Sequence, residues 1–173
     1  MKITKYGVTL VRLTEDKIEL VRNWRNDPKI AQYMEFKEYI TPEMQLEWFN
    51  KINNDNNYFF LIEYEEKEIG LINVRDINSI EKVGEGGIFI FDDNCLNSDI
   101  SFRASLCLND FGFETLLLKK MKAHILRNNK RAIQFNKLIG YKLADNQDGN
   151  LNQLYYLIEE EYNIKKERII RLF

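Results

Sequence analysis

The most constraining feature of the sequence is a series of three strand-like segments between residues 58 and 91. Residues 58–64 are rich in aromatic and branched side chains, which strands favour. A polar run at 65–67 turns the chain back into a second segment at 69–74, and a third follows at 87–91. Consecutive strands of this kind predict an antiparallel meander.

After residue 91 the pattern changes from strand to helix. Apolar residues recur at spacings of three and four between residues 100 and 113, as in a helix packed on a sheet. Further strands are expected at 116–126, 140–143 and 153–158, with helices at 129–139 and 161–172. The second half therefore alternates between strands and helices.

The region before the meander combines one strand with helices. The strand is expected at 8–13, and apolar residues at helical spacing between 18 and 24 predict the first helix. A short helix is expected at 30–36. Thr41 and Pro42 supply a cap and a first-turn proline for a helix that runs to Ile52.

This order of elements predicts an α/β (α+β) fold. A meander followed by β-α-β-α-β implies a mixed, mostly antiparallel central sheet of six to seven strands with helices on both faces. No internal repeat and no linker of Pro, Gly or Ser interrupts the chain, so residues 1–173 are expected to form a single domain.

Composition limits the partners and the compartment. The 25 Lys and Arg residues nearly balance 27 Asp and Glu, which argues against nucleic acid or an anionic membrane as a partner. No stretch has the length of a signal-peptide core or a membrane span, so a cytoplasmic location is expected. Two cysteines, Cys95 and Cys107, and one histidine, His124, predict neither a disulfide framework nor a metal site.

Two distant segments resemble the GNAT acetyltransferases. The segment Asn129-Lys-Arg-Ala-Ile-Gln-Phe-Asn-Lys-Leu-Ile-Gly-Tyr141 matches the late family signature, and Arg22-Asn-Trp-Arg-Asn-Asp27 is similar to the opening of the branch that acetylates amino-sugar nucleotides. The resemblance implies an N-acetyltransferase that uses acetyl-CoA as donor, and a small-molecule primary amine, on a nucleotide-linked amino-deoxysugar, as acceptor.

Other functions stay open on the sequence alone. The acceptor is alternatively a protein N-terminus, as in the ribosomal-protein branch, or an aminoglycoside, and the fold alternatively binds a partner without catalysis. For a sugar nucleotide, the resemblance implies that Arg22, Trp24 and Arg25 lie beside the acceptor cleft, where the arginines pair with a diphosphate. Their alternative role is a helix with solvated charges and one apolar anchor. A homodimer is compatible with the sequence.

The resemblance also implies where acetyl-CoA binds. The family has a glycine-rich loop before its central helix, where backbone N–H groups surround the pyrophosphate. Residues 96–101 occupy this position without a glycine. In one interpretation the loop still binds the donor; in the other, Asn97 and Asp99 prevent it. The residues implied in donor binding are Asn97, Ser98, Ile100 and Ser101 of the loop, Ile88, Phe89 and Ile90 of a splayed strand, and Asn129 and Arg131 of the next helix.

Transfer of an acetyl group to an amine requires a proton acceptor and a donor to the developing oxyanion. The resemblance implies a backbone N–H at Ile88 or Phe89 as the oxyanion donor. Glu85 matches the family's acid at the start of the fourth strand and is the expected general base, the alternative being an exposed turn residue. Asn136 replaces the family's tyrosine acid, and its amide is expected to contact the leaving thiolate. His124 is expected to be a packed strand residue.

Overall fold

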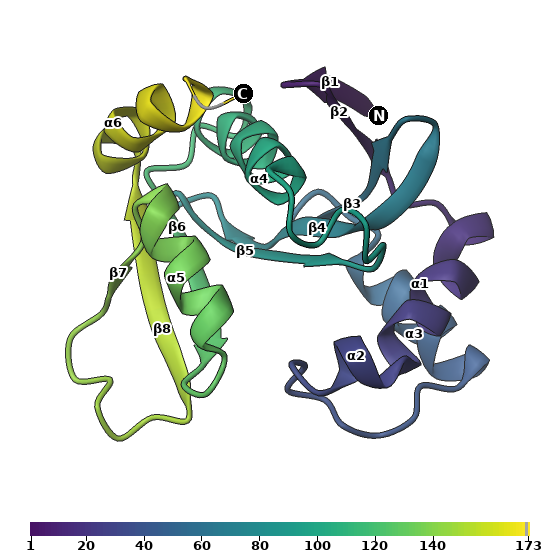
Figure 1. The fold of residues 1–173 in the computed structure, drawn as a ribbon. Coiled ribbons are helices and arrows are strands. Elements are labelled where there is room, and N and C mark those ends of the chain that lie inside the picture. Colours follow the sequence, from purple (N-terminus) through teal and green to yellow (C-terminus); the bar gives the residue numbers. More distant parts are fainter. Residues whose placement is uncertain (172) are drawn as a thin grey trace.

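The computed structural model describes residues 1–171 and 173, and over these residues eight strands form one sheet. Their order across the sheet is β1-β2-β3-β4-β5-β6-β8-β7 (Figure 1). The strands are β1 (Lys2–Lys5), β2 (Val8–Arg12), β3 (Tyr58–Tyr64), β4 (Lys67–Asn78), β5 (Val83–Ile90), β6 (Lys120–Leu126), β7 (Lys142–Leu143) and β8 (Asn152–Ile158). All neighbours are antiparallel except β5 and β6. The predicted mixed, mostly antiparallel sheet is thus confirmed.

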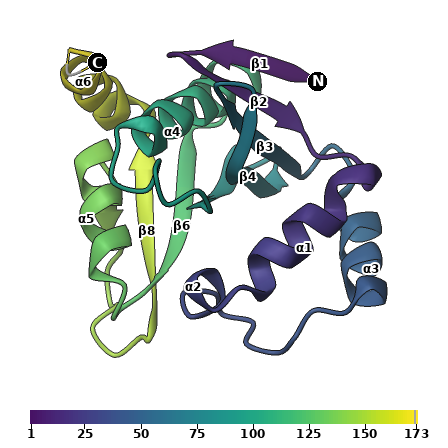
Figure 2. The same ribbon diagram turned by 45° about the vertical axis from the view of Figure 1, so that its right-hand side comes forward.

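Helices cover both faces of the sheet, as predicted (Figures 1 and 2). One face carries α1 (Ile18–Asn26), α2 (Pro28–Ala31) and α3 (Pro42–Ile52); the other carries α4 (Ile100–Asp110), α5 (Lys130–Ile139) and α6 (Glu159–Ile170). The larger core lies under α4 to α6, and a smaller one lies between α1, α3 and the central strands. Thr41 caps α3 by accepting a hydrogen bond from the Met44 N–H, with Pro42 at the first helical position.

Two N-terminal elements differ from the sequence prediction. Strand β1 was not predicted; it is a half-exposed edge strand joined to β2 through Tyr6 and Gly7, whose φ angles are 58° and 76°. Tyrosine does not mark such a turn in a sequence. The short helix expected at 30–36 is instead α2, because Asp27 caps it at the Lys29 N–H, 2.9 Å away, and Pro28 starts it.

The central strands also have different limits. Strand β5 begins at Val83, not at residue 87, and Gly86 and Gly87 pair with β4 in regular register. The irregularity lies opposite, between Arg75 and Asn78. Close packing explains why position 87 holds a glycine, because a Cβ at Gly87 would lie 3.0 Å from Oδ1 of Asn73.

The segment after α4 and the last helix differ as well. Strand β6 begins at Lys120, not at 116, because a π-helical turn (Phe111–Thr115) continues α4 and Leu117 then adopts a φ of 53°. Helix α6 begins at Glu159, two residues before the expected start.

A buried ion cluster fastens both ends of the described chain to α4. Asp110, whose side chain is 4% exposed, pairs with Lys5 of β1 and with Lys166 of α6. The hydroxyls of Tyr6 and Tyr162 each donate to it at 2.6 Å. Burial opposes ionisation of this carboxyl, but these four donors outweigh that effect and hold the pKa of Asp110 below its usual value.

We expect Asp110→Asn to lower the free energy of unfolding by about 2 kcal/mol at neutral pH, because two lysines lose their buried counter-ion while Lys5 keeps partial access to water. Since the folded pKa of Asp110 lies below the unfolded one, its contribution is present at neutral pH and disappears as the pH falls through the folded value. Urea unfolding at several pH values measures this. Glu167→Gln, on the exposed side of α6, is the control. Equal stability of wild type and Asp110→Asn at pH 7 would contradict the prediction.

Candidate active site

Strands β5 and β6 separate soon after they meet. They share three parallel pairs, Val83 with Lys120, Gly84 with Met121 and Glu85 with Lys122. Beyond these, β5 stays paired with β4 and β6 stays paired with β8, so the two strands diverge. A gap therefore opens at the centre of the sheet, with unpaired backbone groups on its edges.

Backbone alternation determines which β5 amides face this gap. The Phe91 N–H donates to the Ile69 carbonyl of β4 at 2.7 Å, so Phe91, and by alternation Phe89, direct their backbone groups toward β4. The backbone groups of Ile88 and Ile90 consequently point into the gap. Of the two expected oxyanion donors, Ile88 has the required orientation, while Phe89 packs its ring against Trp24 at 6.2 Å.

The loop before α4 keeps amides available although it lacks glycine. Ser98 caps the helix, since its Oγ accepts from the Ile100 N–H at 3.3 Å and donates to the Cys95 carbonyl at 2.7 Å. Among the described residues, no acceptor contacts the N–H groups of Asn97, Asp99 and Ser101. The helix start therefore presents unpaired donors, as an anion requires.

Asp99 does not occupy the space in front of these amides. Its carboxylate pairs with Arg103 one turn along α4, at 2.7 Å, and Arg103 also donates to the Tyr6 carbonyl at 3.2 Å. The Asp99 charge thus lies on the β1–β2 side of α4. Its distance from α5 and its pairing reduce the repulsion of a diphosphate that the sequence suggested.

The opposite flank of α4 faces α5. Arg131 donates to the Leu96 carbonyl and, at 3.3 Å, to Oδ1 of Asn97, so its guanidinium lies beside the loop. Asn129 caps α5 by accepting from the Ala132 N–H at 3.1 Å. Arg131 therefore lies beside the loop whose amides are unpaired, at the start of α4.

Asn136, which stands in place of the family's tyrosine acid, and Tyr141, which follows it in the signature, have different surroundings. The Asn136 amide donates to the Ala132 carbonyl at 2.9 Å and is engaged within its own helix. Tyr141, which the sequence supplied only as part of a signature, is buried, and its hydroxyl lies 3.3 Å from where a Cβ at Gly86 would stand. Burial raises the pKa of this hydroxyl. Tyr141 thus lies at the point where β5 and β6 part.

Glu85 is buried, not exposed in a turn, with 5% of its surface accessible. Its carboxylate lies 2.5 Å from Arg75 Nη2, 3.0 Å from His124 Nδ1 and 3.4 Å from Lys122 Nζ. Burial opposes its ionisation. Arg75, His124 and Lys122 outweigh this effect and hold the pKa of the carboxyl below its usual value.

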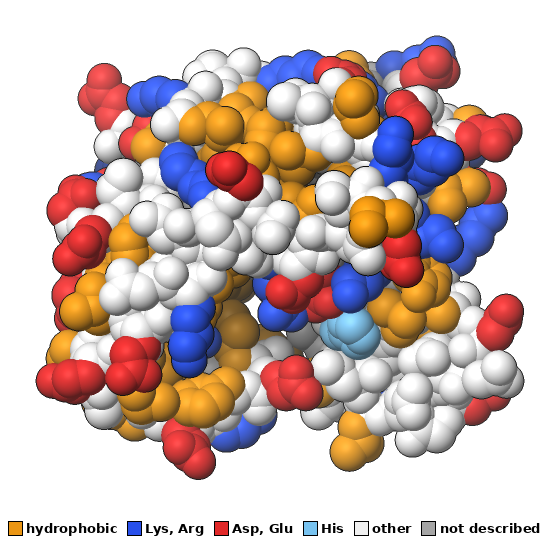
Figure 3. Space-filling view, turned by 180° about the vertical axis from the view of Figure 1, so that it is seen from behind, with side chains coloured by type: hydrophobic (Ala, Val, Ile, Leu, Met, Phe, Trp, Pro, Cys, Tyr) orange, Lys and Arg blue, Asp and Glu red, His pale blue; other side chains and the backbone are white. Residues whose placement is uncertain are grey.

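His124 is a site residue that the sequence analysis set aside. It lies on β6 two residues beyond the last pair with β5, and its side chain is 36% exposed. Seen from behind, acidic and basic side chains gather around the histidine at the rim of a hollow (Figure 3). No sequence pattern indicates this contact, because it depends on the register between β5 and β6.

The two arginines of α1 differ in their surroundings. Arg22 donates to Glu19 at 2.9 Å, to the Tyr39 hydroxyl at 3.1 Å and to the Ile40 carbonyl at 3.2 Å, so it holds the loop before α3. Arg25 lies over the Trp48 ring at 5.2 Å, and no carboxylate among the described residues pairs with it. Burial lowers the pKa of Arg25.

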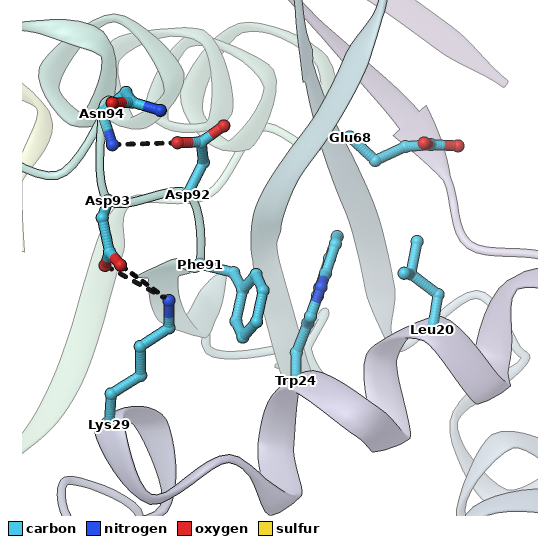
Figure 4. A pocket seen from close by; sticks show the side chains of 8 residues that line it. All are labelled: Leu20, Trp24, Lys29, Glu68, Phe91, Asp92, Asp93 and Asn94. Atoms are coloured by element: carbon cyan, nitrogen blue, oxygen red, sulfur yellow. Dashed lines mark hydrogen bonds and ion pairs between the residues drawn. The ribbon is translucent and has the colours of Figure 1, made fainter.

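Trp24 is a core residue that also lines a cavity of about 410 Å³ at the end of β5 (Figure 4). Its ring stacks on Phe91 at 5.4 Å. Two of the three acids around the cavity have cationic partners: Asp93 pairs with Lys29 at 3.2 Å and Glu68 with Lys17 at 2.5 Å, while Asp92 accepts from the Asn94 N–H at 2.9 Å. The cavity is therefore less negative than its composition implies.

The structure thus assembles two groups of the predicted residues. Glu85 and the amides of Ile88 and Ile90 lie where β5 and β6 separate, and Asn97, Ser98, Ser101 and Arg131 lie together at the start of α4. Arg22 and Asn136 are engaged in structural hydrogen bonds. In the described part of the chain, no helix is both long and apolar enough to span a membrane.

Comparisons with known proteins agree on the family. Residues 8–142 match the acetyltransferase (GNAT) domain. The chain is 29% identical over 137 residues to the acetyltransferase PseH of Campylobacter jejuni strain 81-176, covering 77% of this chain and 82% of that protein. It is 25% identical to the PseH of strain NCTC 11168, covering 88% and 92%.

Solved structures share the fold. FdhC, described as a nucleotide-linked sugar GNAT, superposes with a TM-score of 0.82 at 19% identity, covering 99% of this chain and 97% of that one. The spermidine N-acetyltransferase of Vibrio cholerae, in complex with CoA and spermine, gives 0.76 at 20% identity, covering 91% and 98%. With a domain match across most of its length and this fold, the chain belongs to the GNAT acetyltransferases.

Proposed function

We propose that this acetyltransferase moves the acetyl group of acetyl-CoA to a primary amine on a nucleotide-linked amino sugar. The observation that carries the acceptor assignment is Arg25, a half-buried guanidinium without a carboxylate partner in the described residues. A partly desolvated cation is costly unless an anion pairs with it, and a nucleotide diphosphate supplies one in bidentate geometry.

The position of Arg25 supports this role. It lies near the end of α1, and α2 follows directly; the ribbon places these helices across from β6 and β8 (Figure 2). A contact at 3.4 Å between Asn152 of β8 and Glu35, in the loop after α2, spans the two sides. An acceptor with its amine at the gap therefore has its diphosphate within the region that α1 borders.

The loop at the start of α4 supports acetyl-CoA as the donor. Free amides at Asn97, Asp99 and Ser101, with the Arg131 guanidinium beside them, match the charge of a diphosphate. The gap offers the Ile88 N–H to the thioester oxygen, a kind of contact worth about 3 kcal/mol of transition-state stabilisation. Direct attack by the amine needs no nucleophile from the protein, and its proton leaves toward the Glu85 cluster.

A polyamine acceptor is the competing assignment, because spermidine acetyltransferases share the fold. Such a cation requires unpaired carboxylates. Of the acids that line the cavity beside α1, Asp93 is paired with Lys29 and Glu68 with Lys17, while Asp92 accepts from the Asn94 N–H. Two of these three carboxylates are thus neutralised, which favours an anionic acceptor over a polycationic one.

The donor site is tested with Arg131→Ala. We expect KM for acetyl-CoA to rise about tenfold with kcat little changed, since a charge-assisted contact to phosphate is worth roughly 1.5–3 kcal/mol. Acetyl-pantetheine, which lacks the diphosphate, should show no such difference. Arg168→Ala, an exposed arginine on α6, is the matched control. An equal effect on both donors would remove Arg131 from the phosphate site.

The acceptor class is tested by CoA release across nucleotide-linked amino sugars, free amino sugars, peptides, aminoglycosides and spermidine. We expect the nucleotide-linked amino sugars to give the highest kcat/KM. Arg25→Ala should raise KM for them by about 10–100-fold, because one charge-assisted hydrogen-bonded pair is lost, and should leave KM for the free amino sugar unchanged. Preference for spermidine, or an Arg25→Ala effect equal on both sugars, would overturn the assignment.

A further inference from the structure

We propose that His124 is the general base of the transfer and that Glu85 positions it. This inference rests on the proposed amine acetyltransferase function and goes beyond it by assigning the proton acceptor. It follows from the contact between Nδ1 of His124 and the Glu85 carboxylate, 3.0 Å apart across the mouth of the gap.

Glu85 is poorly suited to accept the proton itself. It is 5% exposed, and two cations, Arg75 and Lys122, lie at 2.5 Å and 3.4 Å from its oxygens. These charges stabilise the carboxylate and weaken it as a base, since the efficiency of a general base rises with its pKa. The Glu85 carboxylate is therefore held in place as an anion by Arg75 and Lys122.

The same carboxylate determines the tautomer of His124. An ionised carboxylate only accepts hydrogen bonds, so Nδ1 of the imidazole must carry the hydrogen. In the neutral ring, Nε2 is then the basic nitrogen, and among the described residues it has no hydrogen-bond partner. The partly exposed ring therefore offers a free, oriented proton acceptor at the rim of the hollow (Figure 3).

The groups around the His124 ring leave Glu85 as the acceptor for its Nδ1 hydrogen. The charged groups that face it are Glu85 from β5, Lys122 from β6 and Arg75 from β4. On β8, Leu154 lies directly opposite His124, and Tyr156 lies opposite Lys122. Within residues 1–171 and 173, Glu85 alone lies within hydrogen-bond distance of Nδ1, and this contact fixes the ring orientation.

The chemical step is then balanced. The amine nitrogen attacks the thioester carbonyl carbon and forms the C–N bond, while Nε2 of His124 takes the proton that the nitrogen loses. The C–S bond breaks, the thiolate leaves, and the imidazolium returns its proton to solvent or to the thiolate. The negative charge of Glu85 stabilises the imidazolium while it exists.

The test compares His124→Asn with Glu85→Gln. Asparagine can still donate to Glu85 from a position close to Nδ1 but has no group at Nε2, so the variant keeps the contact and loses the base. We expect kcat to fall at least about 100-fold with KM for acetyl-CoA unchanged. The loss of kcat/KM at acidic pH, which protonation of the base causes in the wild type, should disappear from the residual rate.

Glu85→Gln retains an acceptor for Nδ1 but removes the charge, so we expect a smaller fall, about tenfold, and the acidic limb should persist at a lower pH because the imidazolium loses its counter-ion. Added imidazole should partly rescue His124→Asn and should not rescue Glu85→Gln. Lys142→Gln, on the exposed edge strand β7, is the control.

These outcomes distinguish a failure of the proposed function from a failure of the base assignment. If the wild type acetylates no amine, the proposed function fails. If the wild type is active and His124→Asn keeps its rate or its acidic limb, the base assignment alone fails. A larger loss in Glu85→Gln than in His124→Asn would identify Glu85 as the base instead.

Discussion

The separation of β5 from β6 after three pairs is the constraint on which the rest of the structure depends. Parallel pairing brings Glu85 next to Lys122, and its end leaves the groups of Ile88 and Ile90 without strand partners. Unpaired backbone groups inside a fold are costly unless a ligand or water satisfies them. The gap is therefore both a weakness of the sheet and its functional opening, and neighbouring contacts must hold it in shape.

Antiparallel strand pairing stabilises the sheet on each side of the gap. On one side β5 stays in regular register with β4, and on the other β6 stays paired with β8 along its length. Helix α4 packs on β1, β2, β4 and β5, and the Asp110 cluster ties it to α6, which follows β8. The ion pair between Asp110 and Lys166 and the contact between Glu85 and His124 therefore join the two halves of the sheet.

The sequence predicted the fold better than the site, for a physical reason. Periodicity reports which face of a segment is apolar, so it located the meander and the helices on both sides, and it missed only β1, whose pattern is weak and whose turn uses Tyr6. Glu85 was recognised from its place on a strand, but its partner was not. The contact between Glu85 and His124, 39 residues apart, depends on the register of β5 against β6, which no local pattern encodes.

The two arginines of α1, Arg22 and Arg25, have different surroundings although they belong to one motif. Arg22 and Asn26 both bind the Ile40 backbone, and they fix the loop that borders the hollow. Trp24 anchors the helix in the core. Arg25 lies over the Trp48 ring of α3, and no carboxylate among the described residues pairs with it. Residues three apart share one face of a helix, so their place on α1 does not by itself separate the two arginines. Their neighbours do, because Arg22 meets Glu19 and the Ile40 carbonyl whereas Arg25 meets an aromatic ring.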